Sequence, residues 1–480
     1  MNFIFFNPDE MRAESIGCWG HPLVSTPNMD QLAAEGTRFS EAHVTHTVCS
    51  PSRCSVLTGW HPHIRGHRSL YHLLAPDEPN LFRYLRKHGW QVVWYGKNDA
   101  LSPESFPDSV DKYGSEPGRP AGQPQNPYPE DHPLYHSFLH EPRGGFEDTA
   151  DYANVQKAIG FLQSQPSEPF AVYLPLIQPH PPYAAPHGYH DMYSAEDIPP
   201  LRPVCSQGKP DFMQRIRATR RLNELTEHQF RDINAKYLGS ISYVDALLGQ
   251  LLQTLDETGL ADDTAVIVWS DHGDWAGDYG LVEKWPAGLD DTLTHVPLIM
   301  RVPGFPSGNT VASGVQHFDI MPTVLELAGI PCEHSHFAQS LIPHLEGRPS
   351  EARRLLFAEG GYDQPHDMWC FEGRTGTSAE SLSKPNHIYY PKIYLQQAEP
   401  YTVCRSVMVR SETHKLIRRT QQIHELYDLK RDPHELQNVY EQADFRSIRD
   451  ELEQELLDWY LRTSDVTPWY EDPRGLPIIE

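Results

Sequence analysis

The chain has 480 residues, with 40 Lys or Arg against 65 Asp or Glu and a formal net charge of -25. That acidity excludes nucleic acid as a partner, because neutralising phosphates requires clustered cations, and it disfavours a long polyanionic substrate. Hydrophobic residues make up 39% of the chain, as in a folded protein with a substantial core. The length favours one large domain with a smaller appendage.

The ends of the chain and its cysteines bear on location. The short apolar run at 3–6 is followed at once by polar residues, without a basic n-region or a cleavage site. No stretch approaches the roughly 20 apolar residues that a membrane span needs. The seven cysteines are odd in number and scattered, unlike a disulfide framework. We expect a soluble protein of a reducing compartment, cytoplasmic or supplied as a mature form, whose apolar tail at 466–480 could support a homo-oligomer.

Short apolar runs alternate with helix-length amphipathic stretches, a pattern typical of parallel strands covered on both faces by helices. The predicted strands are 3–6, 90–95, 170–177, 264–269 and 297–302. Helices are predicted at 25–36 and at 231–258, where apolar residues recur at three- and four-residue steps before Gly259. We interpret the Pro-, Gly- and His-rich segments 102–150 and 181–212 as surface insertions that could rim a site. The fold class is therefore α/β.

The last third of the chain has a different pattern. Two extended segments, 406–419 and 421–429, are joined by a short connection and followed by a helix at about 442–462. This order indicates a small α+β unit. We predict a catalytic domain at 1–350 and a C-terminal subdomain at 351–480.

Polar residues follow four of the predicted strands. In an open α/β sheet the ligand crevice lies beyond the carboxyl ends of the strands, so these side chains should converge on one rim. Strand ends are also where polar residues commonly occur, so any single one could be structural. The residues are Asp9, Glu10, Lys97, Asn98, Asp99, His180, Asp271 and His272.

Three of these side chains suit a metal ion. Two carboxylates and one imidazole, from Asp9, Asp271 and His272, form a partial shell for a hard divalent cation. Ca²⁺ is the preferred ion, and Mg²⁺ and Mn²⁺ are compatible with the same donors. Zn²⁺ would ordinarily require more His or Cys.

The stretch "THTVCSPSRCSVLTG" (45–59) predicts a helix with a cysteine at its start. Ser50 suits an N-cap, Pro51 the first helical position and Gly59 the end. Cys49 then lies at a helix N-terminus, where free amide groups favour an anion. Arg53, one turn later, can reach towards the same point.

Other interpretations of the two cysteines remain open at this stage. Cys54 should point into the helix packing as a structural thiol. A Cys49/Cys54 metal or redox pair is disfavoured by the four-residue gap and by the lack of a second pair. Cys49 could also be a reactive thiol of lowered pKa, with His180 or His272 as its partner.

These residues resemble a known family. "CSPSR" followed by "TG" matches the Cys-x-Pro-x-Arg signature of the type I sulfatases, which belong to the alkaline phosphatase superfamily. Further segments along most of the chain match the family in the family's order. They are "TPNMDQLAAEGTRF", "GK" after a strand, "PHPPY", "SDHGD", "HVPLIMRVPG", "FDIMPTVLELAGI" and "ELYDLKRDPHELQN". Lys284 lies thirteen residues after Asp271.

The resemblance implies an alkaline-phosphatase-like fold, with a large, mostly parallel sheet and a small C-terminal subdomain. It implies that a maturase converts Cys49 to formylglycine, which acts as nucleophile and as metal ligand beside Asp9, Asp271 and His272. Arg53 would hold the formylglycine. Residues implied to bind the sulfate oxygens or protonate the leaving group are Lys97, His180 and Lys284, with His180 as the general acid.

The chain departs from the family pattern at two positions. Glu10 stands where many members have a second aspartate, which leaves its role as a ligand open. Asp99 stands where many have histidine, and a carboxylate cannot supply positive charge to sulfate. Asp99 could instead bind substrate hydroxyls. Further candidates for such contacts, each with an equally open structural interpretation, are His67, Arg68, His72 and Asn98.

The resemblance implies hydrolysis of a sulfate ester. One hydroxyl of the hydrated aldehyde attacks sulfur, and the other later expels sulfate. A thiol has no second hydroxyl and therefore cannot release sulfate in this way. The hydroxyl-binding set favours a sulfated sugar or short oligosaccharide as substrate. A phosphonate or phosphate ester hydrolase on the same scaffold is the alternative enzyme, and a non-catalytic carbohydrate-binding relative is a third interpretation.

Overall fold

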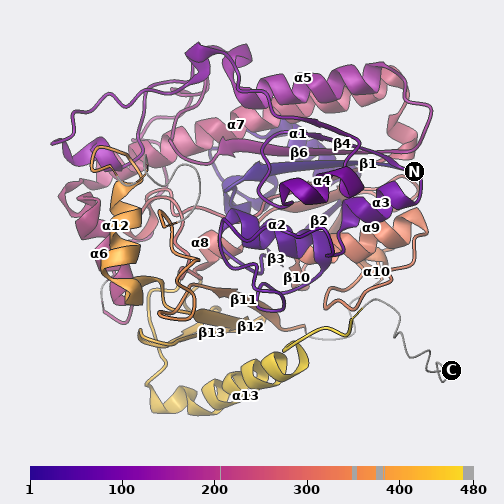
Figure 1. Cartoon of the computed structure of the whole chain (residues 1–480). Helices are drawn as coiled ribbons and strands as arrows, with labels where there is room; N and C mark the ends of the chain where they lie inside the picture. The colour runs from indigo at the N-terminus through magenta and orange to yellow at the C-terminus, as the bar shows by residue number, and fades with distance from the viewer. Residues whose placement is uncertain (206, 349–353, 375–381, 383, 469–480) are drawn as a thin grey trace.

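The computed structural model describes residues 1–205, 207–348, 354–374, 382 and 384–468. The strands of its main sheet are β1 (Asn2–Asp9), β2 (Thr37–Phe39), β4 (Gln91–Tyr95), β5 (Lys112–Gly114), β6 (Phe170–Pro179), β7 (Thr264–Trp269), β8 (Leu298–Arg301) and β9 (Asn309–Val311). Their order is β5-β4-β6-β1-β7-β8-β2-β9, and β4, β6 and β1 lie together in Figure 1. β1 lies at the centre, parallel to both β6 and β7, whereas β8 runs antiparallel to its neighbours. The predicted α/β class and mostly parallel sheet are confirmed.

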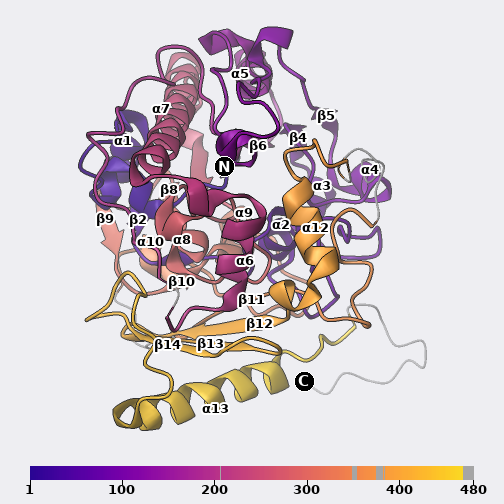
Figure 2. The same cartoon turned by 90° about the vertical axis from the view of Figure 1, so that its left-hand side faces the viewer.

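Helices cover both faces of this sheet (Figures 1 and 2). On one face lie α1 (Pro27–Glu35), α5 (Ala150–Gln163) and α7 (Glu227–Thr258), and on the other α2 (Cys49–Thr58), α3 (Leu81–Lys87) and α9 (Ile320–Ala328). β1 contributes side chains to the apolar core on each face of the sheet, because its side chains alternate in direction. Ile4 and Phe6 pack on one face, and Phe3 and Phe5 pack on the other. α7 begins four residues before the predicted start, at a capping box that Thr226 forms with Gln229.

The C-terminal part forms a second, smaller layer below the main sheet in Figure 2. Its four antiparallel strands are β11 (Leu356–Gly360), β12 (Ser406–Arg410), β13 (His414–Arg419) and β14 (Glu425–Asp428). Helix α13 (Arg446–Arg462) packs Leu452, Leu456 and Trp459 against this sheet. The prediction of one extended segment at 406–419 is wrong. That segment is a hairpin, because Ser411 N–H donates to the carbonyl of His414 and turns the chain.

The remaining elements are short. They are β3 (Ala42–His43), β10 (Val315–Gln316), α4 (Phe106–Ser109), α6 (Asp211–Thr219), α8 (Asp291–Thr294), α10 (Ile342–Leu345) and α12 (Tyr390–Ala398). The predicted insertions lie partly inside the protein rather than on its surface, since Phe138 and Tyr183 are buried in the main core. Within the described part of the chain, no helix combines the length and the apolar character that a membrane crossing requires.

Two predictions fall where the structure is not described. The boundary proposed between residues 350 and 351 lies in the segment 349–353, and most of the apolar tail lies in 469–480; both are outside the described residues. The division into domains and the homo-oligomer therefore stay predictions.

Candidate active site

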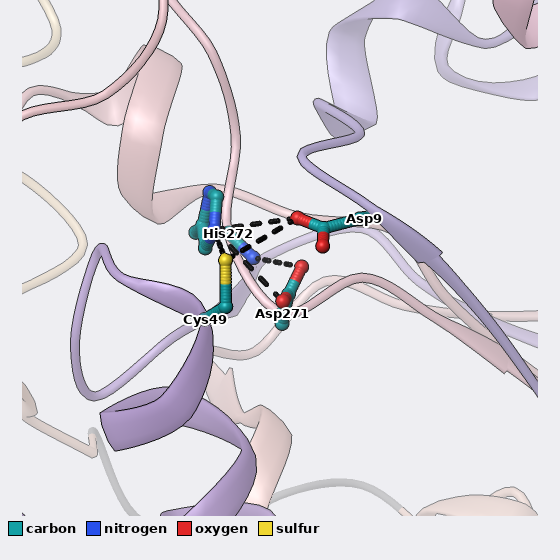
Figure 3. Close-up of side chains that lie close together, drawn as sticks. All are labelled: Asp9, Cys49, Asp271 and His272. Atoms are coloured by element: carbon teal, nitrogen blue, oxygen red, sulfur yellow. Dashed lines mark hydrogen bonds and ion pairs between the residues drawn. The ribbon is translucent and has the colours of Figure 1, made fainter. Parts of the chain in front are cut away.

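Four side chains from three segments meet at the carboxyl end of the sheet (Figure 3). Asp9 ends β1, Asp271 and His272 follow β7, and Cys49 opens α2. One potential ligand atom from each lies within 4.8 Å of all the others. The Cys49 Sγ is 3.2 Å from Nε2 of His272 and 3.6 Å from Oδ1 of Asp9. The predicted rim is therefore assembled, and all four residues are buried.

Cys49 lies at a helix N-terminus as predicted, but the predicted cap is wrong. The helix starts at Cys49 after the extended residue Val48, whose carbonyl accepts the Ser52 N–H. Ser50 is already helical, and its hydroxyl donates to the Leu70 carbonyl at 3.4 Å instead of capping. Gly59 ends the helix in the left-handed region, with φ of 69°.

Arg53 joins the two acids of the rim. Its Nε donates to Oδ2 of Asp271 at 2.8 Å, and its Nη2 donates to Oδ2 of Asp9 at 3.1 Å. Its third nitrogen, Nη1, is buried without a hydrogen-bond partner. Arg53 thus bridges the two carboxylates and retains an unused donor inside the protein.

Lys97 adds a second cation to the rim. Its ammonium contacts Asp9 and lies 2.7 Å from Oδ2 of Asp99. Burial alone would raise the pKa of Asp9, but Lys97 and Arg53 hold it well below its usual range, so the carboxylate stays charged. Asp99 thus contacts Lys97. The side-chain amide of Asn98 forms hydrogen bonds within its own loop. Its Nδ2 donates to the Leu101 carbonyl at 2.6 Å, and its Oδ1 accepts from two backbone N–H groups.

Lys284 and His180 both lie close to Glu10, a residue whose role the sequence left open. The Glu10 Oε2 lies 2.7 Å from the Lys284 ammonium and 3.4 Å from Nε2 of His180. Its other oxygen is buried without a hydrogen-bond partner, and burial raises the pKa of this carboxyl well above its ordinary value. The backbone of Glu10 is left-handed, with φ of 70°, which turns its side chain into the site. His180 donates from Nδ1 to the Pro181 carbonyl at 2.7 Å, so its Nε2 is the nitrogen that faces Glu10.

The two cysteines differ in their surroundings. Burial and the nearby Asp9 raise the pKa of the Cys49 thiol well above its ordinary value, which is the opposite of what a reactive thiolate requires. Cys54 is buried in the core under the sheet, with its Sγ 3.5 Å from the Ala100 carbonyl. Both are free thiols in the structure. The packing role predicted for Cys54 is confirmed.

The donor set at the rim fits a hard divalent cation. Asp9 and Asp271 supply charged oxygens, and His272 donates from Nδ1 to the Gly273 carbonyl at 2.9 Å, which leaves the lone pair on Nε2 facing the other donors. Burial lowers the pKa of His272 to about 4, so the imidazole is neutral and able to coordinate.

The loop that contains the remaining predicted residues lies beside α2, tied to it by the bond from Ser50 to Leu70. His67 is held by Glu78, with its Nε2 3.1 Å from Oε2. Arg68 and His72, in contrast, line a cavity of about 470 Å³ together with Trp369 and Arg405.

Two supporting residues were missed by the sequence analysis. The Ser52 hydroxyl contacts both the Asp271 backbone carbonyl and Nε2 of His317, the latter at 2.7 Å. Through the Ser52 hydroxyl, these hydrogen bonds hold the first turn of α2 against the residue that follows β7. Their signal was present in the helix, because Ser52 lies three positions after Cys49 and therefore on the same face.

Comparison with known proteins decides the family. Residues 1–330 match the family model described as Sulfatase. The chain belongs to the sulfatase family. Residues 360–461 match the model described as N-sulphoglucosamine sulphohydrolase, C-terminal. This sulfatase is therefore a sulfuric ester hydrolase of the alkaline phosphatase superfamily.

Relatives span nearly its whole length. The multifunctional alkaline phosphatase superfamily protein PehA of Trinickia caryophylli is 28% identical, over 98% of this chain and 96% of that protein. Arylsulfatase K of Bos taurus is 25% identical, over 91% and 77%. Among solved structures, the phosphonate monoester hydrolase of Agrobacterium radiobacter aligns with a TM-score of 0.76 and 23% identity over 96% of each chain. A 2-O GAG sulfatase aligns at 0.74 and 21% identity, over 98% of this chain and 95% of that one.

Proposed function

We propose that this sulfatase hydrolyses a sulfate ester on a sugar or short oligosaccharide, with formylglycine at position 49 and a divalent cation, Ca²⁺ first among candidates. The observation that carries the proposal is the meeting of Cys49, at the N-terminus of α2, with Asp9, Asp271 and His272. These three residues and residue 49 would hold the cation. Hydrated formylglycine would supply one hydroxyl that attacks sulfur and a second hydroxyl whose deprotonation later expels sulfate and restores the aldehyde, and the cation would offset negative charge on the transferring group.

The other residues at the rim bind and orient the sulfate group. Arg53 has an unpaired Nη1 beside the two acids, a donor suited to a formylglycine hydroxyl. Lys97 and Lys284 approach from β4 and from the segment after β7, where their ammonium groups would neutralise sulfate oxygens. His180 presents Nε2 on the Glu10 side, and a proton taken from the Glu10 carboxyl, whose pKa burial raises, would pass through Nε2 to the leaving oxygen.

The cavity lined by Arg68, His72, Trp369 and Arg405 supports a sugar as the group that carries the sulfate. Trp369, 61% exposed, gives a flat apolar surface for a ring. Arg68 is paired with Glu359 at 2.7 Å and Arg405 with Asp367 at 2.5 Å, so only their remaining N–H groups are donors for hydroxyls. The structural likeness to a 2-O GAG sulfatase supports the same substrate class. Asp99 and Asn98 remain proposed hydroxyl contacts, as does His67.

Modification of Cys49 requires a maturase, which is the proposed protein partner, and the proposed location is the cytoplasm. Mass spectrometry of protein produced with its maturase tests the modification. The peptide that contains residue 49 should be about 18 Da lighter than its thiol form. The thiol mass alone, in protein that turns over sulfate esters, would refute the formylglycine assignment.

A phosphonate or phosphate ester hydrolase is the second candidate. It is favoured by the match to PehA along nearly the whole chain and by the fold shared with a phosphonate monoester hydrolase. Paired aryl sulfate and aryl phosphonate esters with the same leaving group discriminate between the two. The sulfatase proposal requires the higher kcat/KM on the sulfate ester, and a panel of sulfated mono- and oligosaccharides then identifies the sugar.

A further inference from the structure

A second group of metal-binding side chains lies away from the active site. Glu41, His43 and His295 each place a potential ligand atom within 4.8 Å of the other two. His43 lies on β3 and His295 just after α8, and the two face one another across an isolated antiparallel bridge. Their rings stack with centroids 5.0 Å apart. Residues opposite one another in such a bridge project to the same side, which brings the two imidazoles together.

His43 is buried and has no hydrogen bond. Its side chain is fully buried, and neither Nδ1 nor Nε2 has a hydrogen-bond partner. The nearest charged atom is Oε2 of Glu41, 3.5 Å from Nε2. Burial lowers the pKa of this imidazole to about 4, so it is neutral with a free lone pair. A buried polar ring without partners costs stability unless something binds it.

His295 is already oriented as a metal ligand would be. Its Nε2 donates to the Ser40 carbonyl at 2.7 Å, which leaves Nδ1 as the nitrogen with a lone pair. A bond from one ring nitrogen to a backbone carbonyl is the usual support of a metal-bound histidine. One nitrogen of each imidazole and one carboxylate oxygen of Glu41 lie within 4.8 Å of one another.

The charges around the group are balanced before any ion binds. Arg410, from β12, lies 3.0 Å from Oε2 of Glu41 and 3.3 Å from Oδ2 of Asp291. Lys415 lies 2.9 Å from Oδ1 of Asp291. The arginine is thus shared between two carboxylates, and Glu41 keeps a second oxygen for a cation.

We propose that Glu41, His43 and His295 bind a zinc ion, at a site separate from the sulfate-ester site. Two imidazoles and one carboxylate suit Zn²⁺ better than Ca²⁺, which prefers oxygen ligands. With three protein ligands, a water molecule would complete four-coordination. Glu41 and His295 are partly exposed, which gives the ion a path from solvent.

Zinc at this point would join the strand that leads to Cys49 with the segment that follows α8. β3 precedes α2 by five residues, and Asp291 of α8 makes the ion pairs to Arg410 and Lys415 of the C-terminal sheet. The ion would therefore stabilise the contact between the two sheets rather than take part in hydrolysis.

The test uses the full chain and measures bound metal, not activity. Protein stripped with a chelator is saturated with Ca²⁺ and then dialysed against Zn²⁺, and both metals are counted by mass spectrometry. We expect one zinc per chain with the calcium retained. His43→Gln and His295→Gln should each weaken zinc binding by about 100-fold or more, since each removes a ligand. His334→Gln, at a buried histidine outside the group, should leave it unchanged.

Glu41→Gln is a third variant, chosen because Glu41 is partly exposed and the substitution leaves the core intact. Circular dichroism establishes folding of each variant, and Co²⁺ bound in place of zinc gives visible absorption bands that should disappear with His43→Gln. Absence of zinc from the wild type overturns the proposal. So does zinc that persists in all three variants or that displaces calcium, since either result places zinc at the sulfate-ester site.

Discussion

The ammonium of Lys284 lies 2.7 Å from Oε2 of Glu10, so the lysine proposed to bind sulfate is paired with a residue at which this chain departs from the family pattern. Many sulfatases have aspartate at that position. The extra methylene of glutamate, with the left-handed backbone at Glu10, carries the carboxylate to Lys284 and towards His180. Glu10 is thus a positioning residue for both.

Glu10→Ala should therefore lower kcat/KM on a sulfate ester by about 100-fold, because Lys284 loses the partner that fixes it. Glu10→Gln keeps an oxygen within reach and should lose about 10-fold. Steady-state kinetics with one aryl sulfate measure both. Wild-type kcat/KM in Glu10→Ala would contradict the positioning role.

Arg53→Lys keeps the positive charge but cannot bridge two carboxylates. The change should lower kcat by about 100-fold and weaken cation binding by about 10-fold or more, since Asp9 and Asp271 lose their common support. Turnover and metal content after dialysis are the measurements. Arg38→Lys, at a partly exposed arginine on β2, is the control and should change neither. Normal cation retention in Arg53→Lys would argue against the bridge.

His61 makes stability depend on pH. It is buried under α13, and its Nε2 accepts the Trp459 indole N–H at 3.1 Å. Burial lowers the pKa of His61 to about 3, so the unfolded chain binds the proton more readily. The stability that the neutral ring contributes is present above about pH 6.5 and is lost as pH falls towards 3.

His61→Leu should therefore reduce the loss of unfolding free energy between pH 7.5 and pH 5.5 by about 1.4 kcal/mol. Urea unfolding at the two pH values measures it. Phe337→Leu replaces a ring that packs against His61 and removes no titrating group. It should therefore change the free energy of unfolding equally at pH 7.5 and pH 5.5. The same pH dependence in His61→Leu and wild type would show that His61 does not contribute.

Lys415 anchors the C-terminal sheet to the main domain. It is buried and lies 2.9 Å from Oδ1 of Asp291. Lys415→Met leaves that carboxylate buried without one of its cations, which should cost about 3 kcal/mol of stability. The pair of Lys87 with Glu333 is exposed, so Lys87→Met should cost less than about 1 kcal/mol. Equal losses in the two variants, by urea unfolding, would contradict the anchoring role.

Much of the fold could be predicted because its strands are buried on both faces. Their apolar, β-branched runs predict the ends of β4, β6, β7 and β8 to within two residues. The direction of β8 could not be predicted, because its pairing with β7 and β2 is decided by residues distant in the chain. The hairpin at 406–419 pairs adjacent segments, but its turn contains none of the Gly, Asn, Asp or Pro residues that signal one. The backbone hydrogen bond that turns 411–414 also leaves no apolar pattern.

The same reasoning explains the site. Asp9, Asp271 and His272 could be placed because parallel strands end at one edge, and Cys49 because Pro51 and Gly59 mark the start and the end of a short helix. The hydrogen bonds that the Asn98 amide makes within its own loop could not be predicted, because the conformation of that loop has no sequence pattern. The contact of Glu10 with Lys284 was not predictable, because a left-handed backbone at a glutamate has no sequence signal.

The most direct test of the central claim is the rate of sulfate-ester hydrolysis by Cys49→Ala, produced with the maturase and compared with the wild type. The nucleophile assignment predicts a loss of kcat of at least about 10³-fold with the fold unchanged, because the remaining residues can only bind and polarise the ester. Hydrolysis at the wild-type rate would show that residue 49 is not the nucleophile.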